Sequence, residues 1–204
     1  MTTLYSYIVR EDHGFAPNPY GGVLTVTCCK PIIRRTAQEG DYLAGITGAG
    51  HPAGRGLLLY AARITDKKTM SDYRVWAESE CTDKIPGPGQ RRVGDAMYWE
   101  EPPGVWHRDR QGYHHPDLQE DDVGGRYALL STEFVYFGGN PIELPEDLRP
   151  IAEVRRGHRS SPSNDPYLAD FVAWYDGLPR GIRSSPTMGP MILRPVTIAR
   201  LSRG

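Results

Sequence analysis

Two adjacent cysteines, Cys28 and Cys29, stand directly before Lys30 at the end of an apolar stretch. A cysteine beside a cation and near the start of a helix can ionise and act as a nucleophile. Neighbouring residues of a strand face opposite sides, so at most one of these thiols can line a site. Packing explains both thiols more simply, because a free cysteine is usually a small buried apolar residue, but Cys29 is the candidate nucleophile. Lys30 and Arg34 are candidate anion-binding residues.

A loop rich in glycine and proline, residues 11–22, carries a second group of polar side chains: Asp12, His13 and Asn18. The prolines fix several backbone angles, so the loop can hold an amide and an imidazole in the geometry needed to contact the edge of a base or a sugar. The alternative is a turn in which the Asn and Asp side chains bond only their own backbone.

Three histidines, His107, His114 and His115, lie in a long polar segment. No two of them have the i, i+4 spacing of metal ligands on a helix, and the cysteines are remote in the sequence. We therefore predict no metal site, and the sequence assigns no cofactor. A single imidazole that acts as a general acid or base, or contacts phosphate, explains the segment more simply. His114 is the candidate catalytic histidine.

The C-terminal quarter holds a concentrated basic patch: Arg155, Arg156, His158 and Arg159. Clustered arginines of this kind bind phosphate or a nucleic-acid backbone. The alternative is a solvated loop, since runs of charge commonly keep a surface wet. We select His158 and Arg159 as candidate ligand-binding residues.

The elements that must position these residues are mostly short strands. Gly accounts for 23 and Pro for 18 of the 204 residues, which argues against a helical bundle. Apolar and β-branched stretches predict strands at residues 4–9, 23–29, 41–47, 56–65, 95–99, 127–137 and 191–201. Caps and apolar spacing predict helices at residues 70–78 and 166–176. We predict an α+β fold with a single compact domain, residues 1–180, and a C-terminal extension, residues 181–204, packed on it.

Composition excludes several classes of protein. The formal net charge is −1, so any basic surface that binds nucleic acid or a membrane must be local. Three cysteines without a CxxC pair are a poor disulfide framework and favour a reducing compartment. No apolar run has the length of a signal peptide or a membrane span, so we expect a cytoplasmic protein without membrane contact. The sequence also lacks P-loop, GxGxxG, HExxH and GxSxG signatures, which removes most common enzyme classes.

Several short motifs occur in an order that resembles a known family. They are Asp12-His13-Gly14-Phe15-Ala16-Pro17-Asn18-Pro19, Cys29-Lys30-Pro31, Gly40-Asp41, the stretch 131–138 and Gly157-His158-Arg159. The sequence resembles the bacterial and phage family called nucleotide modification associated domain 2 over nearly the whole chain, to about residue 180. That family is associated with systems that make modified DNA bases, so the resemblance implies a role near modified nucleotides. It also adds Asp41 and Tyr136, which lie in matched segments, to the candidate ligand-binding residues.

The order of the expected elements is similar to that of PUA-like domains such as EVE, YTH and ASCH. Those domains form pseudo-barrels that hold a modified base. We therefore expect either a mixed, strongly bent sheet or a PUA-like open β-barrel, with short flanking helices in both cases.

These candidates lead to one preferred function and two alternatives. We expect Asp12, Asn18, Lys30 and Arg34 to converge on one concave site that binds a nucleotide or modified base, in connection with DNA base modification. The first alternative is an enzyme, a transferase or hydrolase of bases or nucleotides, which uses the same pocket with Asp12 or a histidine as proton carrier. The second is a protein interaction module of a phage or defence system. The expected partner is a nucleotide or modified DNA, and the sequence leaves open whether the protein is an enzyme.

Overall fold

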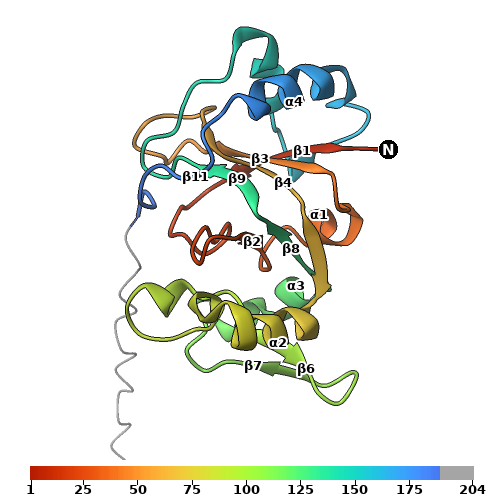
Figure 1. Ribbon diagram of the computed structural model, residues 1–204, viewed down its shortest axis with the longest axis vertical. Coiled ribbons are helices and arrows are strands. Elements are labelled where there is room, and N and C mark those ends of the chain that lie inside the picture. The colour runs from red at the N-terminus through yellow and green to blue at the C-terminus, as the bar shows by residue number, and fades with distance from the viewer. Residues whose placement is uncertain (189–204) are drawn as a thin grey trace, which may run out of the picture.

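A six-stranded mixed sheet forms the centre of the computed structural model, which describes residues 1–188 (Figure 1). Its strands are β1 (Leu4–Val9), β3 (Tyr42–Thr47), β4 (Leu58–Arg63), β9 (Glu133–Tyr136), β10 (His158–Arg159) and β11 (Gly181–Ile182), in the order β10-β1-β3-β4-β9-β11. A second sheet has the order β2-β8-β5 and is formed by β2 (Leu24–Val26), β5 (Asp66–Thr69) and β8 (Tyr127–Ser131). A third is the pair β6 (Tyr98–Glu100) and β7 (Trp106–Arg108). The helices include α1 (Pro31–Thr36), α2 (Met70–Glu80), α3 (Gln119–Val123), α4 (Leu168–Asp176) and the 3-10 helix η4 (Glu146–Ala152).

Two chain segments connect the six-stranded sheet with the three-stranded one. β4 leads into β5 and β8 leads into β9, and the two segments stay antiparallel to each other in both sheets. At the crossing, Thr65 N donates to Leu130 O at 2.9 Å, and Thr132 N donates to Thr65 Oγ1 at 3.0 Å. The fold is therefore the predicted α+β domain, with mixed strands and short helices. Among the described strands, the six-stranded sheet ends at β10 and β11 and does not close into a barrel.

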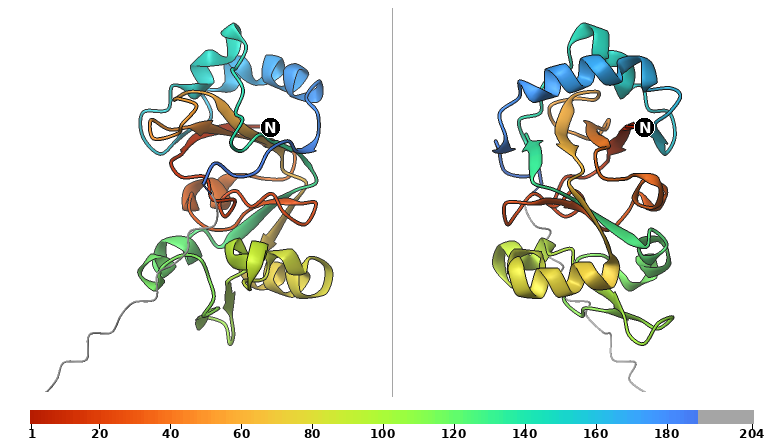
Figure 2. Two further views of the ribbon diagram at one scale, coloured as in Figure 1. Left: turned by 90° about the vertical axis from the view of Figure 1, so that its left-hand side faces the viewer. Right: turned by 45° about the vertical axis from the view of Figure 1, so that its right-hand side comes forward.

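Both faces of the six-stranded sheet are covered, which explains why β1, β3 and β4 are almost continuously buried. α4 and η4 cover one face (Figure 2). There the ring of Tyr42 meets Phe171 and Tyr175 edge-on, with centroids 6.0 and 5.4 Å apart. The other face packs against β2 and α1. The candidate residues that follow β1 and β2 thus lie around one well-packed core.

The helix predicted at residues 70–78 is confirmed as α2, with two further residues. Thr69 caps it, because its Oγ1 accepts the Asp72 N–H at 3.1 Å. Met70, Tyr73 and Ala77 form its buried face. Within the described part of the chain, no helix is both long and apolar enough to cross a membrane.

One predicted strand is shorter in the structure and another is divided. The strand predicted at residues 23–29 ends at Val26, because the backbone of Cys29 and Lys30 takes up left-handed angles instead. The strand predicted at residues 127–137 is divided at Thr132, and its halves belong to different sheets. The strand predicted at residues 191–201 lies outside the described residues.

Candidate active site

Cys29 lies in a tight turn between β2 and α1. The φ angles of Cys29 and Lys30 are 60° and 43°, in the left-handed region that residues other than glycine rarely adopt. Such angles persist where surrounding contacts hold them, and here Asp122 Oδ1 accepts the Cys29 N–H at 2.9 Å. The turn leaves Cys29 partly exposed, whereas Cys28 is fully buried. The two thiols therefore have different surroundings, and Cys29 lines a pocket.

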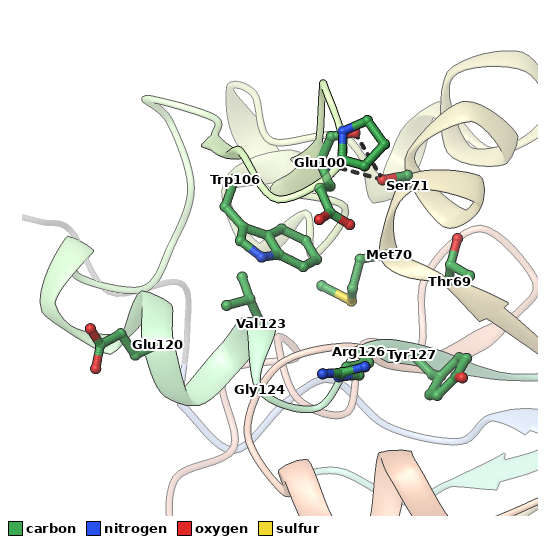
Figure 3. A pocket seen from close by; sticks show the side chains of 11 residues that line it. Thr69, Met70, Ser71, Glu100, Trp106, Glu120, Val123, Gly124, Arg126 and Tyr127 are labelled. Carbon is green, nitrogen blue, oxygen red and sulfur yellow. Dashed lines mark hydrogen bonds between the residues drawn. The ribbon is translucent and has the colours of Figure 1, made fainter.

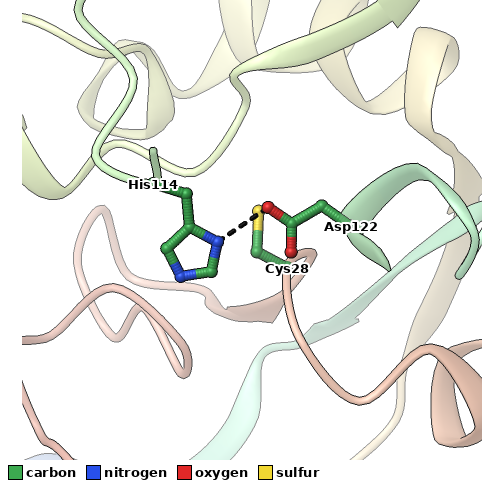
Figure 4. Close-up of side chains that lie close together, drawn as sticks. All are labelled: Cys28, His114 and Asp122. Atoms are coloured by element: carbon green, nitrogen blue, oxygen red, sulfur yellow. Dashed lines mark hydrogen bonds and ion pairs between the residues drawn. The ribbon is translucent and has the colours of Figure 1, made fainter. Parts of the chain in front are cut away.

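The Cys29 thiol is the first member of a chain of three functional groups. Its Sγ lies 3.8 Å from His114 Nε2, and His114 Nδ1 lies 2.7 Å from Asp122 Oδ2. Figure 4 shows this imidazole directed at the carboxylate of Asp122, with Cys28 beside it. Tyr98 also donates to Asp122 Oδ2, at 3.1 Å. A carboxylate that orients an imidazole beside a thiol is the arrangement that activates a nucleophilic cysteine.

The electrostatics favour a protonated His114. Burial opposes the charged imidazole, but hydrogen bonds to Asp122 and Cys29, with the negative charges of both groups, outweigh it and raise the pKa of His114 to about 9. Burial and the Asp122 charge raise the pKa of Tyr98, so its hydroxyl remains a donor to that carboxylate. At neutral pH, His114 is therefore a cation held 3.8 Å from the sulfur of Cys29.

Cys29 and His114 line a pocket, the cysteine pocket, of about 290 Å³. This volume is close to that of the smaller ligand sites of proteins. Its walls include aromatic side chains, with the Phe15 ring 4.5 Å from that of His114 and 4.9 Å from that of Tyr113. Lys30 also lines it, with Nζ 4.7 Å from the centre of the Tyr7 ring. Within the described residues, the buried Tyr113 hydroxyl has no hydrogen-bond partner. The pocket thus offers flat apolar faces and a cation, and its wall contains a buried hydroxyl without a partner in the described residues.

The geometry allows one group of metal ligands to be considered. Within residues 1–188, Cys28, His114 and Asp122 each place one potential ligand atom within 4.8 Å of the others. The chemistry of the donors fits a metal poorly. Burial raises the pKa of the Cys28 thiol well above its usual range, whereas a metal requires the thiolate. His114 Nδ1 is already bonded to Asp122, so these residues form a hydrogen-bonded pair beside an apolar thiol.

A larger hollow of about 720 Å³ lies between α2, α3 and β6 (Figure 3). Trp106, Met70 and Val123 form its apolar wall, and the side chains of Glu100 and Glu120 border it. It holds neither a thiol nor an imidazole. Its chemistry is therefore weaker than that of the cysteine pocket.

Residues 1–191 match the family model described as nucleotide modification associated domain 2. The chain belongs to this family. The resemblance seen in the sequence is thereby confirmed. No curated protein and no solved structure matches the chain. The family's description links the protein to nucleotide modification, and the chemistry must be argued from the pocket itself.

The motifs that carry the resemblance to the nucleotide modification associated domain 2 family divide between the pocket and the core. Lys30 and His13 line the pocket. Asn18 is fully buried, and its amide donates to Val93 O at 2.7 Å. Arg34 is also fully buried, and its guanidinium donates to the carbonyl oxygens of Thr27 and Asp122. Arg34 therefore joins the chain before the cysteine turn to α3, with its guanidinium group inside the fold.

Asp12 and Tyr136 form a separate buried contact. The Tyr136 hydroxyl donates to Asp12 Oδ1, and Thr187 N donates to Asp12 Oδ2 at 2.9 Å. Neither residue lines the cysteine pocket. The expected convergence of Asp12, Asn18, Lys30 and Arg34 is therefore wrong, because three of the four use their polar atoms inside the fold.

The remaining candidates have structural partners. Asp41 is buried and accepts the N–H groups of Thr3 and Gln38, both at 2.8 Å. His158 stands opposite Tyr7 in the β1–β10 pairing, and burial lowers its pKa. Arg159 donates to Asn164 Oδ1 at 3.1 Å. These contacts account for Asp41, His158 and Arg159 without a ligand.

Asp122, Tyr113 and Phe15 are not among the site residues expected from the sequence. Asp122 stands in a run of acidic residues, 93 positions from Cys29, and nothing in the sequence distinguishes it from its neighbours. Phe15 lies within the first motif and Tyr113 directly precedes His114. The position of Phe15 and Tyr113 beside candidate polar residues is the sequence signal that predicts a place for them in the site.

Proposed function

We propose that this member of the nucleotide modification associated domain 2 family is a cysteine-dependent enzyme that modifies a nucleotide, with Cys29 as its nucleophile. The observation that carries the proposal is the Cys29–His114–Asp122 chain at the wall of an aromatic pocket. A protein that only binds a base needs flat faces and polar contacts, but it does not need a thiol beside an oriented imidazolium. This favours the enzyme over the binding protein that the sequence suggested first.

The chemistry is nucleophilic transfer or hydrolysis in two steps. In the first, Cys29 attacks as the thiolate and its sulfur forms a bond to an electrophilic carbon, and the leaving group departs with its electron pair and a proton from the His114 imidazolium at Nε2. In the second, water or an acceptor attacks that carbon and the C–S bond breaks. Sulfur leaves as the thiolate, and His114 takes the proton of the incoming nucleophile. No oxidant or reductant is required.

The other residues of the pocket orient the participants. Asp122 fixes the imidazole and stabilises its charge, as a triad carboxylate does. Phe15 and Tyr113 offer faces on which a base stacks. We propose that binding of the base opens the wall around the buried Tyr113 hydroxyl, so that a polar edge of the base becomes the partner this hydroxyl lacks within the described residues. Lys30 is placed to meet negative charge beside the sulfur. A relationship to the PUA-like base-binding domains would fit this use of the pocket, although the sheet is open.

Alkylation of the folded protein by iodoacetamide, mapped to each cysteine by mass spectrometry, tests the proposal. We expect Cys29 to react near pH 6 at least about tenfold faster than the same cysteine in the unfolded chain. Cys28 and Cys81, both buried, serve as internal controls. His114→Gln should remove the acceleration while Cys29 remains accessible. Equal rates in the folded and unfolded chains would contradict the proposal and leave binding without catalysis.

A further inference from the structure

A second pocket, of about 370 Å³, adjoins the cysteine pocket and is strongly basic. The two pockets share Ile8, Arg10 and Lys30. The rest of the second pocket is lined by basic residues and by small or apolar ones, and none of its lining residues is acidic. The additional basic residues are Arg55, Arg155 and Arg156. Lys30, the cation beside Cys29, is therefore one of five lysine and arginine residues that line the two adjoining pockets.

The fold explains why these side chains gather. β1 and β3 are parallel and in register from Leu4 to Val9, so their carboxyl ends lie at the same edge of the sheet. Arg10 follows β1 and Arg55 lies in the loop after β3. β10 runs antiparallel to β1, so the residues just before it, Arg155 and Arg156, lie beyond the same end. Ligands of sheets with parallel strands commonly bind at this edge.

The four arginines of this pocket are not used by the fold. Arg10, Arg55, Arg155 and Arg156 are exposed, and within residues 1–188 their guanidinium groups form no hydrogen bond or ion pair with the protein. Arg159, three residues further along, donates to Asn164 and Ser163 instead. Unpaired guanidinium groups around one hollow suit the oxygens of phosphate, which they bind through paired hydrogen bonds.

We propose that this arginine pocket, defined by Arg10, Arg55, Arg155 and Arg156, binds the phosphate groups of the nucleotide whose base occupies the cysteine pocket. The proposal rests on the function proposed above and narrows its substrate class to phosphorylated nucleotides rather than free bases or nucleosides. Four guanidinium groups and Lys30 match more than one phosphate. Such a ligand is either a nucleoside triphosphate or a strand with successive backbone phosphates.

Calorimetry tests the proposal with deoxynucleosides, their 5′-triphosphates, and a mixed-sequence single strand of about 10 nucleotides. We expect the triphosphates or the strand to bind, and the nucleosides to bind at least about tenfold more weakly. The double substitution Arg155→Ala/Arg156→Ala should weaken binding of the phosphorylated ligand by at least about tenfold. The matched control, Arg92→Ala/Arg110→Ala, removes two exposed arginines that line neither pocket and should change nothing. For the single-stranded nucleic acid, the slope of log K against log salt concentration should become shallower by about 0.7 for each phosphate contact that is lost.

Protection of Cys29 from iodoacetamide by the same ligands decides between the two sources of phosphate. Better protection by the triphosphates identifies a free nucleotide, and better protection by the strand identifies nucleic acid. Binding that does not depend on Arg155 and Arg156, or arginine-dependent binding that leaves Cys29 unprotected, would overturn the proposal. The rate for ligand-free Cys29 reports separately on the proposed function. A slow rate with intact arginine-dependent binding would refute the nucleophile and retain the phosphate pocket.

Discussion

Two aspartates, Asp95 and Asp122, lie at the centres of two buried hydrogen-bond networks, of which only one opens to a pocket. Asp95 is fully buried and accepts hydrogen bonds from two threonines and a tyrosine: Thr25, Thr27 and Tyr73. Nearby, Lys84 is also fully buried and donates to Asn18 and Val23. Burial lowers the pKa of Lys84 to about 8, although the charge of Asp95 acts in the opposite direction.

The Asp122 network contains similar groups but has an open side. Its carboxylate accepts from the Cys29 N–H, from Tyr98 and from His114. The far edge of the imidazole then reaches the Cys29 thiol, which is partly exposed in the pocket. Asp122 itself is buried.

The difference between the networks distinguishes polar groups that stabilise the fold from polar groups that are accessible to a ligand. When every donor and acceptor of a buried network is satisfied, the network stabilises one packing of the core. A network that ends on an accessible nucleophile keeps its last member available to a ligand. Asn18 illustrates the point, because it belongs to a motif of the family and yet lies in the closed network.

The largest expected effect is on stability in the closed network. Asp95→Ala removes the carboxylate that accepts from three buried hydroxyls and that acts as the counter-charge of Lys84, so we expect a loss of about 3 to 5 kcal/mol in the free energy of unfolding. Chemical denaturation measures it. Asp66→Ala is the matched control, since Asp66 pairs with Lys68 at the surface and should cost less than about 1 kcal/mol. A loss below about 1 kcal/mol for Asp95→Ala would show that its network does not support the fold.

A smaller effect concerns the pH dependence of stability in the open network. The folded pKa of His114 is raised from 6.5 to about 9, so its contribution is fully present below pH 6.5 and is lost as the pH rises through 9. We expect this contribution to be about 2 to 3 kcal/mol, allowing for partial exposure.

Unfolding of the wild type and His114→Gln across this pH range measures that contribution. The difference between their free energies of unfolding should shrink as the pH rises. The titration of Lys84 cancels in this difference, because both proteins contain Lys84. His115→Gln is the control, because the His115 side chain is largely exposed. A difference that does not change with pH would contradict the raised pKa.

The smallest expected effect on stability is at Tyr113. Its hydroxyl is buried without a partner in the described residues, so Tyr113→Phe should change the free energy of unfolding by less than about 0.5 kcal/mol. The same change should weaken binding of a phosphorylated nucleotide several-fold. Tyr98→Phe is the contrast, since it removes a hydrogen bond to Asp122 and should cost about 1 kcal/mol or more. Unchanged binding in Tyr113→Phe would remove this hydroxyl from the ligand site.

The sequence predicted residues of the cysteine pocket better than it predicted their partners. Cys29, Lys30 and His114 were found from residue type, because few side chains can act as nucleophile, cation or proton carrier near neutral pH. Asn18 and Arg34 were misplaced, because a buried polar residue that bonds backbone carbonyls has the same sequence signal as one that binds a ligand. Only the three-dimensional contacts separate these cases.

The same limit applies to the fold. The stripe that includes Phe171 and Tyr175 predicted α4, since a helical period is visible locally. The bend at Thr132 was not predicted, because a strand that changes sheets keeps its β-forming composition on both sides. The left-handed turn at Cys29 was missed for a related reason. It depends on Asp122, far along the chain, rather than on a glycine.

Side-chain nitrogen NMR of His114 tests the central claim most directly, because the proposed chemistry requires an imidazolium beside the Cys29 sulfur. We predict that His114, assigned by comparison with His114→Gln, titrates with a pKa of about 9 in the wild type. In Asp122→Asn, the pKa should fall toward the ordinary value of 6.5. A wild-type pKa at or below 6.5 that Asp122→Asn does not change would contradict the account of Cys29, His114 and Asp122 as a catalytic unit.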